Sequence, residues 1–230
     1  MNKGFTLAEV LITLGVIGVV SAMTLPTLIQ KQRDKANVAK LQKVYSVLSQ
    51  AILRAKNEQG EFSAWSMPNS QAGCNEVFSY IKPYIKYIKD CGNKSGCWAE
   101  DVKSLTGSNA LWVGNNLNDL KPLGYYSFTL SDGTNVVIDN IGLSSVHQDY
   151  CGFNLRDFPD TFSTFWVDIN GNKAPNVVGR DIFIFLLSNN GLVPAGYNDT
   201  TNCTTDSSKS TIDAGFTCAF KVLQEKGINY

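Results

Sequence analysis

The sequence contains few of the residues on which most catalytic and metal sites depend. His147 is the only histidine, no Ser or Cys motif lies near it, and no C-x-x-C pair occurs. A nucleophile elbow, a phosphate-binding loop and a dinucleotide fingerprint are also missing. The sequence therefore predicts a protein that is not an enzyme, with no catalytic residue, no metal ligand and no cofactor.

Charged residues are almost missing from the stretch between Phe5 and Ile29, where Glu9 is the only one. These 25 residues are enough to cross a membrane, because a bilayer core needs about 20 apolar residues in a helix. An acid in such a segment costs up to about 2.5–3.5 kcal/mol at mid-membrane. Glu9 is therefore expected to have a function.

The formal net charge is zero, but the charges are unevenly distributed. Residues 1–60 have eight Lys and Arg against three Asp and Glu, whereas residues 61–230 have twelve against seventeen. A basic beginning and an acidic remainder indicate two parts with different surroundings. The acidic part argues against nucleic acid as the main ligand, because phosphate contacts require a basic surface.

Cysteine is missing from the first 73 residues and then occurs six times, as Cys74, Cys91, Cys97, Cys151, Cys203 and Cys218. An even number confined to the part beyond an apolar segment is typical of disulfides in an oxidising compartment. Many pairings are possible. The shortest loops, Cys91 with Cys97 and Cys203 with Cys218, are the easiest to close, which leaves Cys74 with Cys151.

Two ordinary explanations of the first 30 residues fit poorly. A secretory signal peptide fits Lys3 and the small residues at 20–22, but Glu9 interrupts its apolar region and helical sequence continues past the cut. A plain membrane anchor fits the length but leaves Glu9 unexplained. Three basic residues at 31–35, against one near the start, also fit its orientation poorly.

The stretch KGFTLAEVLITLGVIGVVSAMTLP resembles the start of type IV pilins and type II secretion pseudopilins. The family pattern is a short basic leader that ends in Gly, followed by Phe-Thr-Leu and a Glu at the fifth mature position. Here these are Gly4, residues 5–7 and Glu9. A Gly within the apolar run and a Pro near its end are also common in the family, and Gly18 and Pro26 match them.

The resemblance implies that a prepilin peptidase cleaves the chain between Gly4 and Phe5 and methylates the new amino group of Phe5. The protein then stays in the bacterial inner membrane as a single-pass subunit with a cytoplasmic N-terminus. An inner-membrane assembly platform then moves it into a periplasmic or cell-surface filament. The partners are other pilin or pseudopilin subunits, and Glu9 is expected to act in assembly.

The sequence after Ile29 predicts that the helix continues in amphipathic form. Apolar residues recur at steps of three and four, namely Val38, Leu41, Tyr45, Leu48 and Ile52. We predict one helix from Phe5 to about Asn57, stopped by Gly60 and kinked at Pro26, because proline lacks an N–H and crowds the preceding turn. The apolar stripe is expected to pack on the sheet of the following domain.

Strand patterns predict an α+β fold, in which the long helix packs on an antiparallel sheet. Four strands are expected at 125–130, 135–140, 162–170 and 181–187, the first two joined by an Asp-Gly turn. A helix interrupted by Pro83 is expected at 76–90. Residues 198–218 form a polar loop, and the resemblance to pilins implies that a disulfide closes it.

The predicted organisation has four parts: a leader at 1–4, a membrane or filament-core segment at 5–29, an amphipathic segment at 30–60, and a periplasmic or extracellular domain at 61–230. The predicted function is a structural subunit of a type IV pilus-like filament. The alternatives are a pseudopilin of a type II secretion system and a membrane-tethered periplasmic binding domain on a pilin-like stem.

Asp168, Asn170 and Asn172 offer the hard oxygen ligands that Ca²⁺ takes. The segment lacks the glycine and the terminal acid of a calcium loop, and Asn170-Gly171 is a common turn signal. A turn is therefore favoured over a metal site, and the sequence leaves calcium binding open.

Overall fold

The computed structural model describes residues 6–65, 70–110, 124–139, 150–153 and 161–230. The chain divides into two compact units, Met1–Ala36 and Asn37–Tyr230. The helix α1, Leu7–Gln59, is continuous from the first unit into the second. Its expected beginning at Phe5 lies outside the described residues.

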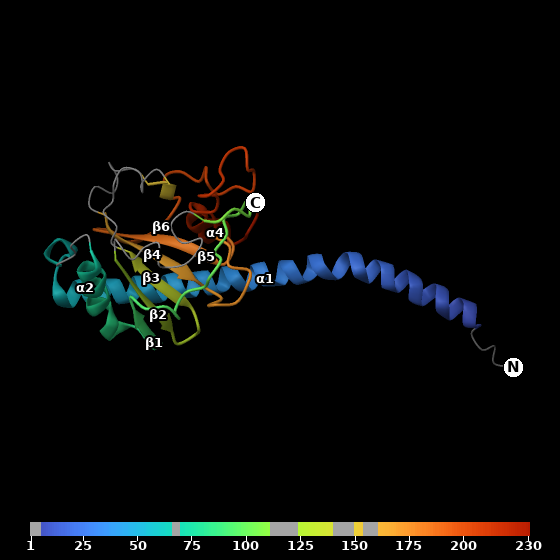
Figure 1. Ribbon diagram of the computed structural model, residues 1–230, viewed down its shortest axis with the longest axis horizontal. Helices are drawn as coiled ribbons and strands as arrows, with labels where there is room; N and C mark the ends of the chain where they lie inside the picture. Colours follow the sequence, from blue (N-terminus) through green and yellow to red (C-terminus); the bar gives the residue numbers. More distant parts are fainter. Residues whose placement is uncertain (1–5, 66–69, 111–123, 140–149, 154–160) are drawn as a thin grey trace. The chain divides into compact units, whose positions relative to one another are not determined.

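In the first unit, α1 continues through Pro26 without a break, and Figure 1 draws this half as a curved ribbon. Threonine hydroxyls in this apolar stretch donate to backbone carbonyls of their own helix. Thr24 Oγ1 donates to the Val20 carbonyl at 2.9 Å, and Thr13 Oγ1 donates to the Val10 carbonyl at 2.9 Å. Such bonds satisfy the hydroxyls without help from solvent.

In the second unit, the predicted apolar stripe of α1 is buried. Leu41, Leu48 and Ile52 are fully buried and Val38 nearly so, while Tyr45 is partly buried and stacks on Phe185 with ring centroids 5.4 Å apart. Smaller side chains of the same helix, Val44, Ala51 and Ala55, are buried with them. The predicted stripe is therefore the buried face of α1 in this unit.

Gly60 ends the helix as predicted. Its φ is +93°, in the left-handed region that glycine adopts without strain, and its N–H donates to the Lys56 carbonyl at 2.9 Å. The 3₁₀ turn η1, Phe62–Ala64, follows and buries Phe62.

The sheet is a six-stranded antiparallel meander in sequence order. Its strands are β1 Tyr87–Gly92, β2 Tyr125–Leu130, β3 Asn135–Asp139, β4 Thr161–Asp168, β5 Ile182–Ser188 and β6 Gly191–Pro194. The helix α2, Gln71–Ile81, precedes the sheet, and α4, Cys218–Glu225, follows it. The α+β fold class is confirmed (Figure 1).

The described residues correct the prediction at two places. The helix expected at 76–90 ends at Ile81, a 3₁₀ turn η2 at Lys82–Tyr84 contains Pro83, and the rest is strand β1. Pro83 cannot continue the helix, and the tyrosine and isoleucine after it suit a strand. The second correction is β6, where residues 191–194 pair with β5 although we expected only turn residues there.

Alternate residues of the strands supply two apolar clusters, one on each face of the sheet. Phe165 and Phe183 belong to the cluster that includes the α1 stripe. Trp166 and Ile184 belong to the other cluster, together with Cys151 and Phe216. Because both faces are covered, all of β5 is buried.

Truncation of the stripe tests its contribution to stability. Leu48→Ala is expected to lower the free energy of unfolding by about 2–5 kcal/mol, because it leaves a cavity in a fully buried site. Leu53→Ala is the matched control, because Leu53 is 49% exposed on the same helix, and it should cost under about 0.5 kcal/mol. Urea unfolding of the full chain in detergent, followed by tryptophan fluorescence, measures both. Equal losses would contradict the burial of the stripe.

Candidate functional site

The start of α1 is organised by reciprocal hydrogen bonds between Thr6 and Glu9. The Thr6 N–H donates to Glu9 Oε2 at 2.8 Å, and the Thr6 hydroxyl donates to the same oxygen at 2.9 Å. The Glu9 N–H donates back to Thr6 Oγ1 at 3.2 Å. This is a capping box, in which an N-cap Thr and a Glu three residues later satisfy donors that the helix leaves unpaired.

The capping box gives Glu9 a contact that the sequence prediction missed. The spacing Thr-x-x-Glu at the start of an apolar run is its known signature and could have identified Thr6. Gly4 and Phe5, the predicted cleavage and methylation residues, lie outside the described residues.

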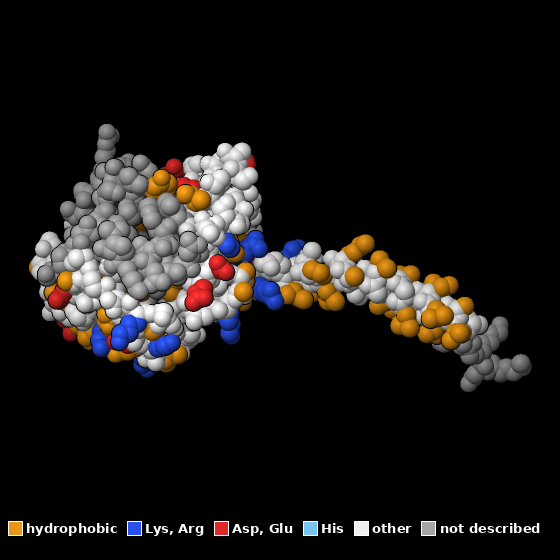
Figure 2. Space-filling model, in the orientation of Figure 1, with side chains coloured by type: hydrophobic (Ala, Val, Ile, Leu, Met, Phe, Trp, Pro, Cys, Tyr) orange, Lys and Arg blue, Asp and Glu red, His pale blue; other side chains and the backbone are white. Residues whose placement is uncertain are grey.

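An apolar surface surrounds the helix beyond this cap. Thirteen large hydrophobic side chains between positions 7 and 29 are at least 43% exposed: Leu7, Val10, Leu11, Ile12, Leu14, Val16, Ile17, Val19, Val20, Met23, Leu25, Leu28 and Ile29. Figure 2 shows hydrophobic side chains along this segment on the face in view. By length and composition, α1 can cross a membrane, and none of its most apolar window is buried. Such a surface requires lipid or other apolar helices around it.

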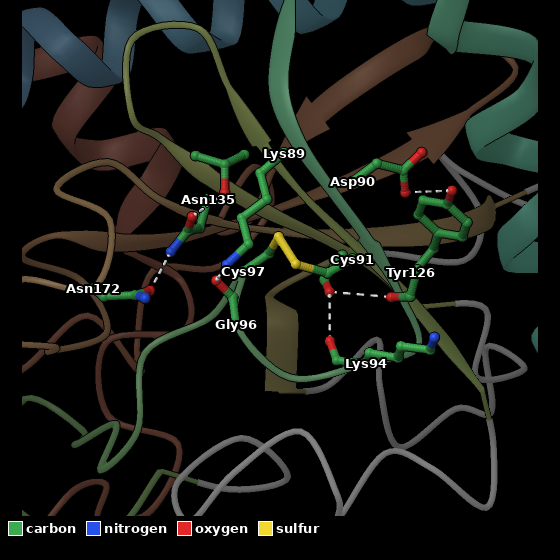
Figure 3. The surroundings of a disulfide bond; sticks show 12 residues. Lys89, Asp90, Cys91, Lys94, Gly96, Cys97, Tyr126, Asn135 and Asn172 are labelled. Carbon is green, nitrogen blue, oxygen red and sulfur yellow. Dashed lines mark hydrogen bonds between the residues drawn. A yellow bond between two sulfur atoms is a disulfide. The ribbon is translucent and has the colours of Figure 1, made fainter.

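The second unit has two disulfides among its described residues, Cys91–Cys97 and Cys203–Cys218. Figure 3 shows the first, at the end of β1. Lys89 Nζ donates to the Gly96 carbonyl at 2.8 Å, and the Ser127 hydroxyl donates to the Gly92 carbonyl at 3.1 Å. These bonds join the loop to the edge of the sheet.

The Cys203–Cys218 bond closes the polar loop, as the resemblance implied. The loop is held against residues 103–107, because the Leu105 N–H donates to the Ala214 carbonyl at 2.9 Å. The Thr106 hydroxyl also donates to the Thr211 carbonyl at 2.8 Å.

The third expected disulfide, Cys74 with Cys151, is not formed in the structure, which corrects the expectation of three bonds. Cys74 is buried on α2, whose apolar residues Val77 and Phe78 belong to the cluster on the α1 side of the sheet. Cys151 belongs to the cluster on the other side, where burial raises the pKa of its thiol to about 12. A thiol with such a pKa is a poor nucleophile.

Two buried acids lie beside the predicted turn at 168–172. Asp168 and Asp181 are both fully buried, and Asn170 links them. The Asn170 N–H donates to Asp168 Oδ1 at 3.2 Å, and Asn170 Nδ2 donates to Asp181 Oδ2 at 2.7 Å. The Val177 N–H donates to Asp181 Oδ1 at 2.6 Å, so both oxygens of Asp181 accept a hydrogen bond.

Burial shifts the titration of both acids upward. Desolvation raises the pKa of Asp181 to about 7, although backbone and amide donors oppose the shift. Desolvation and the nearby charge of Asp181 raise the pKa of Asp168 well above its usual range, while backbone donors and Lys40 act in the opposite direction.

The three candidate calcium ligands do not converge in the structure. Asn172 Oδ1 accepts a hydrogen bond from Asn135 Nδ2 at 2.6 Å, whereas Asn170 contacts the two acids (Figure 3 shows the Asn135–Asn172 bond). The bond from the Asn170 N–H to Asp168 Oδ1 forms an Asx turn, as the Asn-Gly signal indicated. In the described part of the chain, no group of three or more His, Cys, Asp or Glu side chains could hold a metal ion.

The long apolar helix, the antiparallel sheet packed on its second half and the capped Glu9 define a pilin-like protein. Residues 1–25 match the family model described as prokaryotic N-terminal methylation motif, which identifies the chain as a precursor of the type IV pilin or pseudopilin kind. Residues 27–203 match the model described as family of unknown function (DUF6613), and the chain belongs to that family. No curated protein and no solved structure matches the chain.

The buried acids make the stability of the second unit depend on pH. Their folded-state pKa values lie above the unfolded ones, so the folded state holds protons that the unfolded state has lost, and stability falls as pH rises. Between pH 5 and pH 8 the free energy of unfolding should fall by on the order of 2 kcal/mol. Denaturant unfolding in buffers that contain a chelator measures the fall.

Variants of the two acids and one control variant test whether the acids cause this fall. Asp168→Asn should reduce it, because the amide cannot ionise. Glu225→Gln, at an exposed acid on α4, should leave it unchanged. If Asp168→Asn and Asp181→Asn both keep the full fall, the acids are not its cause.

Proposed function

We propose that the mature protein is a structural subunit of a type IV pilus-like filament. In this proposal residues 1–4 are removed as a leader and Phe5 becomes the N-methylated first residue. Residues 5–29 span the inner membrane and then form the filament core, and residues 30–60 connect them to the exported domain at 61–230. The methylation motif at residues 1–25 supports processing by a prepilin peptidase.

The exposed apolar half of α1 is the observation that carries the proposal. A helix that is hydrophobic all round is stable only in lipid or among other apolar helices. A subunit that moves from the membrane into a bundle of identical helices meets this requirement in both places. Among the described residues of the second unit, by contrast, most large apolar side chains are buried.

Glu9 gives the bundle a preferred register. Apolar helices can slide past one another with little cost, whereas an ion pair in an apolar environment forms at one position only. The staggered neighbour can bring the cationic amine of its Phe5 to Glu9. Removal of one partner from such a buried pair costs about 3–5 kcal/mol.

The same features support the proposed topology. A cytoplasmic N-terminus places residues 61–230 on the periplasmic side, where the two disulfides can form and persist. Incorporation into the filament by an inner-membrane assembly platform follows.

Two other candidate functions are consistent with the same features: a pseudopilin of a type II secretion system and a membrane-tethered binding domain. Recovery of the protein in filaments sheared from the cell surface separates the proposed role from the tethered domain.

The first test concerns processing. Removal of residues 1–4 from the 230-residue chain should leave a protein of 226 residues that begins with N-methylated Phe5. Intact mass and sequencing of the N-terminal peptide measure this in cells that have a prepilin peptidase, and cells without the peptidase are the control. A mature chain that begins at Met23 would instead show ordinary signal-peptide cleavage.

The second test separates the charge of Glu9 from its capping role. Glu9→Val loses both, whereas Glu9→Gln keeps a side chain that can complete a capping box but has no charge. Both variants should be cleaved after Gly4 and should accumulate in the membrane. As the only copy expressed, each should yield at least ten-fold less sheared filament, because a loss of about 1.4 kcal/mol per contact already changes an equilibrium ten-fold.

Quantified filament and membrane fractions give the result. If Glu9→Gln assembles as well as the parent chain, capping explains the role of Glu9 and the ionic register is wrong. Failure of Glu9→Val to be cleaved would assign Glu9 to peptidase recognition instead.

A further inference from the structure

A cavity of about 290 Å³ lies in the second unit. Residues 103–107 form one wall, residues 175–180 form another, and Thr205 of the disulfide-closed loop completes it. This volume is close to the lower limit of ligand sites in proteins, so the cavity suits a small molecule.

Backbone hydrogen bonds between distant segments build the walls. The Lys103 N–H donates to the Asn176 carbonyl at 2.9 Å, and the Val178 N–H donates to the Lys103 carbonyl at 2.9 Å. The bond from Leu105 to Ala214 attaches the same wall to the Cys203–Cys218 loop. The cavity is therefore formed before any ligand arrives.

Two cations, Arg180 and Lys103, line the cavity, and none of its described lining residues is an acid. Arg180 Nε is buried and has no hydrogen-bond partner. Its neighbour Asp181 accepts bonds from Val177 and Asn170 and forms no hydrogen bond with Arg180 Nε in the structure.

The position of Arg180 is fixed by its backbone. Its N–H donates to the Val177 carbonyl at 3.1 Å, and its carbonyl accepts a bond from Asn37 Nδ2 at 3.1 Å. A buried donor without a partner is rare, and the guanidinium group matches the two oxygens of a carboxylate or phosphate. A bound oxyanion would satisfy it.

We propose that this cavity binds the carboxylate group of a small organic molecule. Arg180 holds the anion, and Lys103 adds positive charge while its Nζ also donates to Asn109 Oδ1. Leu105, Pro175 and Val177 offer apolar surface to the carbon skeleton. The binding site is independent of the filament role and gives the exported domain a ligand of its own.

Thermal unfolding of the full chain in detergent tests the site, with glucuronate, glucose and inorganic phosphate as probes at equal ionic strength. Glucuronate should raise the unfolding temperature of the parent chain in a saturable manner, and neutral glucose should not. Arg180→Gln should abolish the shift. Lys173→Gln, which removes an exposed lysine outside the cavity, should keep it.

Isothermal titration with glucuronate gives a second measurement that does not depend on the stability of the variants. Arg180→Gln should weaken binding at least ten-fold. Lys103→Gln, a second cavity variant, should also weaken it. No glucuronate binding by the parent chain, or equal binding by Arg180→Gln, would overturn the site. If phosphate binds as tightly as glucuronate, the site recognises the anion alone, and the proposal of an organic ligand is wrong.

Discussion

The contact between the second half of α1 and the sheet is the interaction on which the rest of the exported domain depends. Leu41, Leu48 and Ile52 are fully buried in it, and the cluster they join includes residues from β2 to β6. Without that helix, one face of the sheet would present phenylalanine and leucine side chains to water. The strands can therefore be apolar on both faces only because the helix is part of the same chain.

Polar contacts fix where the helix lies along the sheet. Lys43 forms an ion pair with Asp132 at 2.9 Å in the β2–β3 turn, and Lys56 Nζ donates to the Asn189 carbonyl at 3.3 Å between β5 and β6. Asn37 donates to the Arg180 carbonyl just before β5. Exposed pairs of this kind add little stability. Their contribution is to fix the position of α1 along the sheet. Because Asn37 bonds to the backbone of Arg180, the same contacts help to position this residue in the proposed anion cavity.

Features that depend on local periodicity could be predicted from the sequence, whereas features that depend on partners could not. The stripe at Val38–Ile52 and the strands β2 to β5 follow from spacing and residue type. Strands β1 and β6 lie at the edges, and each is defined by pairing with one neighbour, which no local pattern shows. The pairing of Asp168 with Asp181 through Asn170 joins residues 13 positions apart across a turn, so it appears only in three dimensions.

The capping box explains how an acid can be tolerated in an apolar helix and still be able to bind a cationic partner. Both Thr6 donors bind Oε2 of Glu9, so this oxygen keeps hydrogen bonds when water is removed. The other carboxylate oxygen, Oε1, takes part in neither of these two bonds. In the proposed filament a cationic amine can therefore bind Oε1 without breaking the cap, and the negative charge already lies at the helix N-terminus, where the helix dipole stabilises it. The cap and the intermolecular ion pair thus support each other, because a carboxylate held in one orientation loses less entropy when the amine arrives.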